Sequence, residues 1–277
     1  MGPGTSMPEL GRRGGLEVLT WPVFAGLPIA AVVTTRDGGG SSGPYASLNL
    51  GLHVGDDPEV VVANRHRAAA AAGLGLDDLV FCSQPHGRGV AVVDRSQRGR
   101  GSRSLGDAVA DADALVTAAP GVGLVVLVAD CVPLVLYEPA AHVVACVHAG
   151  WRGTVARVAQ AAVEAMAGLG ARPNRVLAGI GPAVPASRYQ VGDEVADAAR
   201  ACFPTDTDTA LQADGRGRWR LDLRAANRRV LVEAGVPAGN ISLDGTGTGE
   251  GTPFFSHRAT QPCGRFAAIA ALHADAG

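Results

Sequence analysis

Three apolar runs rich in β-branched residues follow one another between residues 123 and 147, and they constrain the fold more than any other feature of the chain. They are separated by "ADC" at 129–131 and by "EPAAH" at 138–142. Each run is too short for a typical helix and is bounded by turn residues, which is typical of buried strands. The longest of them is also far shorter than the roughly 20 residues that span a bilayer. We therefore expect consecutive strands inside a globular protein.

Helical patterns and shorter strand patterns flank this segment. Helices are expected where apolar residues recur at helical spacing between a starting cap and a glycine stop. The segments that fit are 58–74, 153–170, 192–203 and the second half of 219–236. Strands and helices are mixed but do not alternate strictly. This mixture predicts an α+β protein built of layered sheets rather than a doubly wound fold.

The composition narrows the classes of function. The 277-residue chain has a formal net charge of -2, which provides no general electrostatic reason to bind nucleic acid or an anionic membrane. Its basic residues are all arginines, which excludes Schiff-base chemistry and the lysine-dependent phosphate loop. Five cysteines without dense spacing favour a reducing cytoplasm over a disulfide scaffold. We expect a cytoplasmic protein that binds small molecules; the oligomeric state is not predicted.

The domain organisation is expected to be simple. Residues 1–17 contain glycine and charge but no apolar stretch, so they predict a disordered tail rather than a signal peptide. Residues 18–277 are then a single domain.

The segment 123–147 also predicts a specific pair of side chains. A hairpin with a two-residue turn at Pro139 and Ala140 would place Cys131 directly opposite His148, with Cβ atoms about 5 Å apart. A bulge near Pro133 would slip the register by one residue and turn one of the two side chains away. The predicted proximity of a thiol and an imidazole therefore depends on this register.

Such a pair has three interpretations. It can be a structural pair in the core, a cysteine nucleophile with its histidine base, or part of a metal site. A metal site needs a further ligand, and His86 is the natural candidate because "SQPHGRG" ends a strand in a glycine-rich turn. Two histidines and one thiolate leave the fourth tetrahedral position open, which suits a catalytic zinc ion. Cys146 is interpreted as a core residue or as a neighbour of the ligands, rather than as a ligand itself, and Asp111 and Asp113 as turn residues.

Several motifs, in order over about residues 30–272, resemble those of the YfiH/LACC1 family, also called the multicopper polyphenol oxidase or laccase domain family. They are "RDGGGSSGPYASLNLGLHVGDDPEVVVANR", "QPHG", "ADCVPLVLYEP", "VHAGWRGTV", "GPAVPASRYQVGDEV" and "FFSHRATQPCGR". The resemblance implies a four-layer α/β/β/α sandwich, similar to the deamidase domain of a bacterial cytotoxic factor. It also implies that the domain is catalytic and that His86, Cys131 and His148 are both its metal ligands and its catalytic residues.

The resemblance implies purine chemistry. Members of the family phosphorolyse adenosine, inosine, guanosine and methylthioadenosine, and they deaminate adenosine. Copper-dependent phenol oxidation is an older assignment, and one bacterial branch is connected with editing of peptidoglycan precursors. Two positions depart from the family pattern: "DGTGTGEG" around Thr246 lacks the usual Cys-Thr pair, and Gln190 replaces a common glutamate.

The histidine content weighs against oxidation. A multicopper oxidase joins a trinuclear copper cluster to a blue-copper site, which together require more histidine ligands than the seven in this chain. We therefore expect a zinc-dependent purine nucleoside phosphorylase with adenosine deaminase side activity, in which copper can occupy the same site. The alternatives are a copper-associated polyphenol oxidase, a cysteine amidase that edits peptidoglycan precursors, and an interaction protein with a structural metal.

Four residues are candidates for binding the substrate. Arg36 and Arg258 lie in turns beside small residues, where they could bind phosphate or form surface salt bridges. Arg152 directly follows the hairpin and could steer anions or brace the turn. Asn49 could donate a hydrogen bond to ribose or cap a loop.

Overall fold

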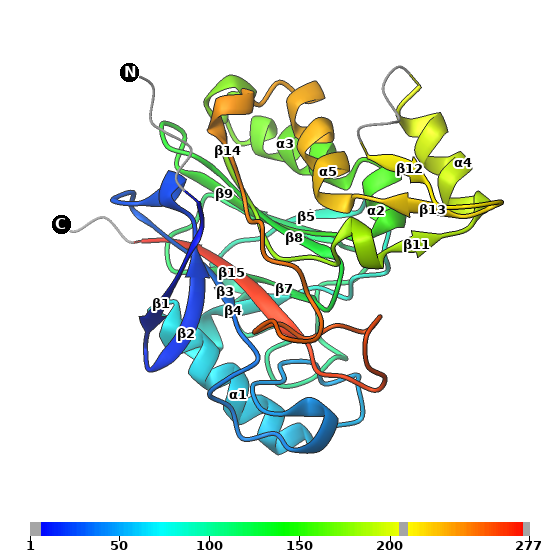
Figure 1. Ribbon diagram of the computed structural model, residues 1–277. Coiled ribbons are helices and arrows are strands. Elements are labelled where there is room, and N and C mark those ends of the chain that lie inside the picture. Colours follow the sequence, from blue (N-terminus) through cyan, green and yellow to red (C-terminus); the bar gives the residue numbers. More distant parts are fainter. Residues whose placement is uncertain (1–6, 205–209, 274–277) are drawn as a thin grey trace.

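Two β-sheets that lie face to face form the centre of the molecule (Figure 1). The computed structural model describes residues 7–204 and 210–273. The first sheet has the strand order β1 (Glu9–Arg13), β2 (Leu16–Thr20), β3 (Ile29–Thr34), β15 (Phe266–Leu272), β7 (Gly123–Val128) and β4 (Leu79–Phe81). The second has the order β14 (Ile241–Leu243), β10 (Leu177–Ile180), β8 (Val132–Glu138), β9 (Val143–Ala149), β6 (Ala114–Thr117) and β5 (Val90–Val92).

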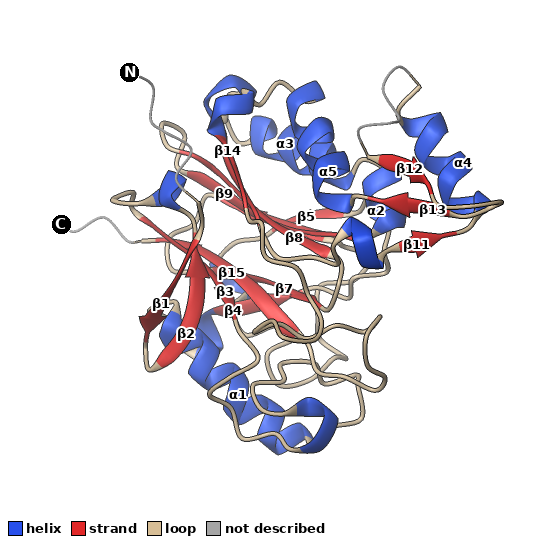
Figure 2. Ribbon diagram, in the orientation of Figure 1, coloured by secondary structure: helices blue, strands red, loops and turns tan. Residues whose placement is uncertain are grey.

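Helices cover the outer face of each sheet (Figure 2). On the first sheet lies α1 (Pro58–Ala71), and on the second lie α2 (Trp151–Val155), α3 (Val158–Gly168) and α5 (Leu223–Glu233). A small sheet of β11 (Gln190–Val191), β13 (Trp219–Leu221) and β12 (Leu211–Ala213) stands to one side with α4 (Asp193–Cys202). The result is the expected α+β fold with α/β/β/α layers.

The apolar core explains why the segment 123–147 is apolar without alternation. In β9, Val144 and Cys146 pack between the two sheets, whereas Val143 and Val147 pack under the helices. A strand that is buried on both faces favours apolar side chains at successive positions, so its sequence is a nearly continuous apolar run.

The hairpin of β8 and β9 has a longer turn than expected. Glu138 pairs with Val143, so residues 139–142 form the turn, and His142 adopts a left-handed backbone with φ 52°. Pro133, rather than Cys131, lies opposite His148. The predicted register was wrong by two residues. Because side chains alternate along a strand with a period of two, Cys131 and His148 still project to the same side.

The expected disordered tail is wrong for residues 9–17. β1 and the start of β2 pair in an antiparallel hairpin, from Glu9 opposite Thr20 to Arg13 opposite Leu16. The side chains of β1 are exposed, so its sequence lacks the apolar pattern of a strand, but Leu16 and Val18 of β2 pack against α1 and fix the hairpin. Residues 1–6 lie outside the described residues.

The helix expected over 153–170 is divided in two. Arg157 adopts a left-handed backbone with φ 64° between α2 and α3, and its guanidinium donates to Gln160 and to Glu233 of α5. The side-chain pattern of two helices in succession resembles that of one, so the break was not visible in the sequence.

Over the described ranges, no helix combines the length and the apolar character that crossing a membrane requires.

Candidate functional site

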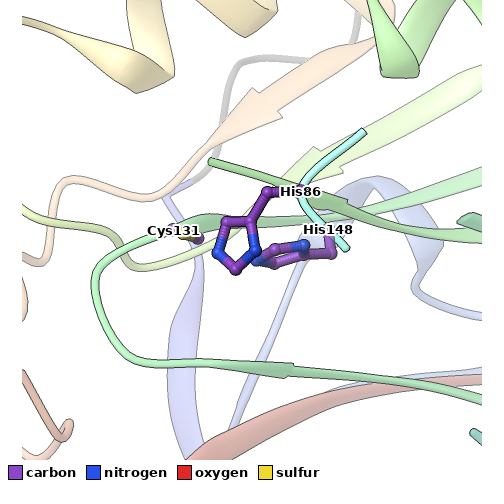
Figure 3. Close-up of side chains that lie close together, drawn as sticks. All are labelled: His86, Cys131 and His148. Carbon is purple, nitrogen blue, oxygen red and sulfur yellow. The ribbon is translucent and has the colours of Figure 1, made fainter. Parts of the chain in front are cut away.

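The chain crosses from the first sheet to the second twice at one end of the sandwich. Residues 82–89 link β4 to β5, and residues 129–131 link β7 to β8; because β4 and β7 are parallel, both links leave from the same end. His86 lies on the first link, Cys131 ends the second, and His148 lies near the end of β9. Figure 3 shows the three side chains pointing toward one another from these separate segments.

The three side chains are close enough to share one ion. One nitrogen of each histidine and the sulfur of Cys131 all lie within 4.8 Å of one another, and the two imidazole rings are nearly perpendicular, with centroids 4.7 Å apart. Gly150 leaves the necessary space: a Cβ there would lie 2.9 Å from Sγ of Cys131 and 3.1 Å from Cδ2 of His86. A larger residue at position 150 would displace one of the two side chains.

Asp113 holds two of these segments in place. Its fully buried carboxylate lies 2.8 Å from Nδ1 of His148 and accepts the backbone N–H groups of His86 (3.0 Å) and Gly87 (2.6 Å). His86 adopts a left-handed backbone with φ 65°, which is uncommon for a residue other than glycine and is typical of functional sites. The interpretation of Asp113 as a turn residue missed this role. It immediately precedes β6, whose pairing with β9 places it beside His148.

The charges of the site favour a thiolate. Burial raises the pKa of the Cys131 thiol, but the charge of His148 and hydrogen bonds from His148 and His86 outweigh burial and lower that pKa to about 6. Burial lowers the pKa of His148, whereas Cys131 and Asp113 raise it to about 9. Burial also raises the pKa of Cys82 to about 12, so that thiol stays protonated. Cys131 is therefore the better candidate for a ligand or nucleophile.

A cavity of about 740 Å³ opens beside the three side chains. Its wall combines apolar groups with hydrogen-bonding groups, as sites for small molecules commonly do, and its volume lies in the range of such sites. Among the lining residues are Phe81, Gln84, Leu127, Tyr189, His257 and Gln261. Burial raises the pKa of Tyr189 to about 12, so its phenol remains a hydrogen-bond donor at neutral pH.

Arg258 is the one predicted substrate-binding residue among the described residues that line this cavity. Its backbone N–H donates to the carboxylate of Asp130 over 2.6 Å, and its guanidinium donates to the carbonyl oxygen of Gln190. Asp130 directly precedes Cys131, so this contact fastens the carboxyl-terminal loop to the site. The role of Arg258 in binding phosphate stays a prediction.

The structure does not bring the other two arginines into the cavity. The guanidinium of Arg36 donates twice to the carbonyl oxygen of Ala46 (3.0 and 2.8 Å) and lies over the ring of Phe255. Arg152 is exposed on α2 and lies over the ring of Trp151, 4.3 Å from its centroid. These contacts are with neighbouring parts of the chain, so both arginines stabilise the local structure instead of lining the cavity.

Asn49 is fully buried, and its side chain forms hydrogen bonds that hold its own loop in place. Its carbonyl oxygen accepts the backbone N–H groups of Gly51 and Arg265, both over 2.9 Å, and its amide donates to Asp56. The loop-capping alternative, rather than a contact with ribose, describes this residue.

His53, Arg65 and Arg265 also line the cavity and were not predicted from the sequence. They lie within the motifs that carry the family resemblance, but no local pattern distinguishes them from surface residues.

Comparison with known proteins places this site in a family. The family model described as multi-copper polyphenol oxidoreductase laccase matches residues 30–273. The chain is 41% identical over 244 residues to the purine nucleoside phosphorylase YlmD of Geobacillus stearothermophilus, which covers 86% of either chain. It is 42% identical over 231 residues to the adenosine deaminase RL5 of an unknown prokaryotic organism, which covers 83% of this chain and 88% of that one.

The fold agrees with these sequence relationships. The crystal structure of YlmD from Geobacillus stearothermophilus matches with a TM-score of 0.91 and 37% identity, covering 97% of this chain and 99% of that chain. The region that the family model matches includes His86, Cys131 and His148, the second sheet, and the first sheet without β1 and β2. The chain therefore belongs to the multicopper polyphenol oxidoreductase laccase family, the YfiH/LACC1 family that its motifs resemble.

Proposed function

We propose that this protein phosphorolyses purine nucleosides (adenosine, inosine, guanosine and methylthioadenosine) and deaminates adenosine as a side activity. The observation that carries the proposal is the cluster of one cysteine and two histidines in the wall of a cavity of about 740 Å³. The names of the relatives, purine nucleoside phosphorylase and adenosine deaminase, support this choice of substrate class.

The three side chains suit zinc. Zinc accepts histidine nitrogen and cysteine thiolate, and a catalytic site keeps one position free of protein ligands. The lowered pKa of Cys131 supplies the thiolate, and the carboxylate of Asp113 orients His148, as is usual for metal-bound histidines. When bound, zinc would supply a Lewis acid that polarises substrate oxygen and activates water. Copper can use the same donors.

The chain's own residues have defined tasks in phosphorolysis. An oxygen of phosphate forms a bond to C1′ of the ribose while the bond between C1′ and the purine nitrogen breaks. The purine leaves with that electron pair and takes up a proton. Tyr189 and Arg258 offer hydrogen-bond donors in the cavity wall, and the apolar side chains of Phe81 and Leu127 exclude water from the reacting atoms. In deamination, water replaces the amino group at C6 of adenosine and ammonia leaves.

The test separates these reactions by their products. Zinc-loaded, copper-loaded and apo protein are incubated with adenosine, with and without phosphate. We expect phosphate-dependent release of adenine and ribose 1-phosphate from the zinc form, with inosine as a minor product that needs no phosphate. Absence of every purine product from a protein that still binds metal would refute the proposal. Consumption of a phenol by the copper-loaded form alone would instead support oxidation.

One observation favours a second candidate, a cysteine amidase that acts on peptidoglycan precursors. Asp113 contacts Nδ1 of His148, and His148 is hydrogen-bonded to Cys131, which is the order of orienting acid, base and nucleophile. This candidate predicts amide hydrolysis that survives chelation and stops when Cys131 is alkylated. The phosphorylase proposal predicts the loss of turnover on chelation.

A further inference from the structure

Arg65 is a buried arginine with an unused hydrogen-bond donor in the cavity wall. It is 1% exposed, and its Nε and Nη1 donate to the carbonyl oxygens of Leu50 (2.8 Å), Gly101 (2.6 Å) and Ser102 (3.0 Å). Its Nη2 is buried and finds no partner among the described residues. A buried donor without an acceptor costs about 1–3 kcal/mol, so the group is expected to have an acceptor that a bound molecule supplies.

The charge of Arg65 is also uncompensated. Within residues 7–204 and 210–273 it forms no ion pair, its acceptors are neutral carbonyl groups, and its guanidinium lies over the ring of Phe81. Burial lowers its pKa to about 9, which still leaves it a cation at neutral pH. Burying a cation without a counter-ion is costly, so this position favours an anionic ligand.

A second cation, Arg265, belongs to the same wall. Its backbone is fastened to the loop that also holds Arg65, because Leu50 donates to its carbonyl oxygen and Asn49 accepts its N–H, both over 2.9 Å. Gly51 makes room for its side chain, since a Cβ at that position would lie 2.8 Å from its Cγ. The guanidinium donates to the carbonyl oxygens of Cys263 and Gly264, and it too forms no ion pair with a described residue.

His53 completes the group. It follows the same loop and lines the cavity, and partial burial together with the charges of Arg265 and Arg65 lowers its pKa to about 4. His53 lines the same cavity as His86, Cys131 and His148, so the group faces the space beside the three clustered side chains. The one carboxylate among the described lining residues, Asp130, already accepts from Thr248 and from the backbone of Arg258.

We propose that His53, Arg65 and Arg265 form a phosphate-binding subsite at this side of the cavity. Two guanidinium groups and an imidazole match a tetrahedral oxyanion, and arginine donors are suited to its oxygens. The phosphate is either free orthophosphate, as the co-substrate of the proposed phosphorolysis, or the ester group of a nucleotide. The choice of phosphate over another oxyanion rests on the proposed function. The subsite replaces Arg36 as the predicted phosphate contact.

The direct test measures binding of phosphate to the metal-free protein, so that zinc cannot be the anion's partner. We expect orthophosphate or adenosine monophosphate to raise the midpoint of thermal unfolding of the wild type, and the rise to be lost in Arg265→Gln and His53→Gln. These variants are preferred because Arg65 bonds three carbonyl groups and its removal can unfold the loop. Arg175→Gln, an exposed arginine outside the cavity, is the matched control and should keep the rise.

The two sources of phosphate are distinguished by the same measurement. A rise with orthophosphate assigns the subsite to the co-substrate, and a rise with adenosine monophosphate alone assigns it to a phosphate ester. If neither ligand raises the midpoint of thermal unfolding of the wild type, the subsite is overturned. It is also overturned if the midpoint rises equally in Arg265→Gln and His53→Gln.

Kinetics separate this inference from the proposed function. If the wild type phosphorolyses a nucleoside, Arg265→Gln should raise the KM for phosphate about tenfold or more and change the KM for the nucleoside far less, since a charged hydrogen bond to phosphate is lost. An unchanged KM for phosphate, or a rise in Arg36→Gln instead, overturns the subsite while phosphorolysis stands. A wild type without phosphorolysis refutes the proposed function, and the binding measurement still decides the subsite.

Discussion

At the scale of single residues, Asp113 controls the geometry of the candidate metal site. Its carboxylate joins His148 to the backbone of the loop that carries His86, so replacing it with Asn removes a charged partner from three contacts. We expect Asp113→Asn to lower zinc affinity about 10- to 100-fold, the usual effect of losing a partner of a ligating histidine. Competition against a chromogenic chelator measures the affinity.

The neighbouring aspartate is the control for this variant. Asp111 is exposed and has a left-handed backbone with φ 52°, which asparagine also tolerates. Asp111→Asn should therefore bind zinc as the wild type does. Equal affinity in Asp111→Asn and Asp113→Asn would show that the carboxylate does not orient the ligands.

Residues that lie far apart along the chain come together at the site, and only some of them could be predicted from the sequence. His86, Cys131 and His148 lie in distinctive motifs, so they could be named in advance. Asp113 acts on His148 only because β6 pairs with β9, across 35 residues of sequence. Arg265 immediately precedes β15, and its backbone N–H donates to Asn49, a residue more than 200 positions earlier in the chain, only in the folded protein. Contacts of this kind have no local pattern.

At the scale of elements, the amino-terminal hairpin depends on a glycine that packs against α1. Gly14 has φ 54°, and a Cβ there would lie 2.8–2.9 Å from backbone atoms of Ala70 and Ala71. Gly15 has φ 85°, but a Cβ there would meet nothing within 4 Å. Gly14→Ala combines a strained backbone with a clash, whereas Gly15→Ala has the strain alone.

We therefore expect Gly15→Ala to lower the free energy of unfolding by about 1 kcal/mol and Gly14→Ala to lower it by clearly more. Urea unfolding followed by circular dichroism measures both. A hairpin that does not pack on α1 would make the two losses equal.

The elements were predicted better than their connections. The apolar run from 123 to 147 indicated its strands because burial on both faces requires it, and α1 begins at the expected Pro58. The turn at 139–142 was predicted too short because His142 takes a left-handed backbone that the sequence does not announce. The period of two along a strand kept Cys131 and His148 on one side despite that difference.

At the scale of the whole molecule, the site lies where the two sheets are joined but is not what holds them together. The core between the sheets is apolar and continuous, with Leu124, Val126, Val135 and Val144 fully buried in it. The three clustered side chains lie at the edge of this core: His86 is exposed to the cavity, Cys131 is partly buried against the core, and His148 is buried near the end of β9. We infer that the protein folds without metal and that a metal ion adds stability by binding the folded state.

Removal of zinc should consequently lower stability without unfolding the chain. Free zinc at about 100 times its dissociation constant contributes about 2.7 kcal/mol, and each kcal/mol corresponds to about 2–4 °C in the midpoint of thermal unfolding for a domain of comparable size. We expect Cys131→Ser to show native circular dichroism in the near and far ultraviolet, with no zinc-dependent rise in that midpoint. Cys202→Ser, a half-buried thiol outside the cavity, should keep the rise. If Cys131→Ser or the chelated wild type instead lost its near-ultraviolet signal at 25 °C, the metal would be structural, and the interpretation as an interaction protein would be favoured over an enzyme.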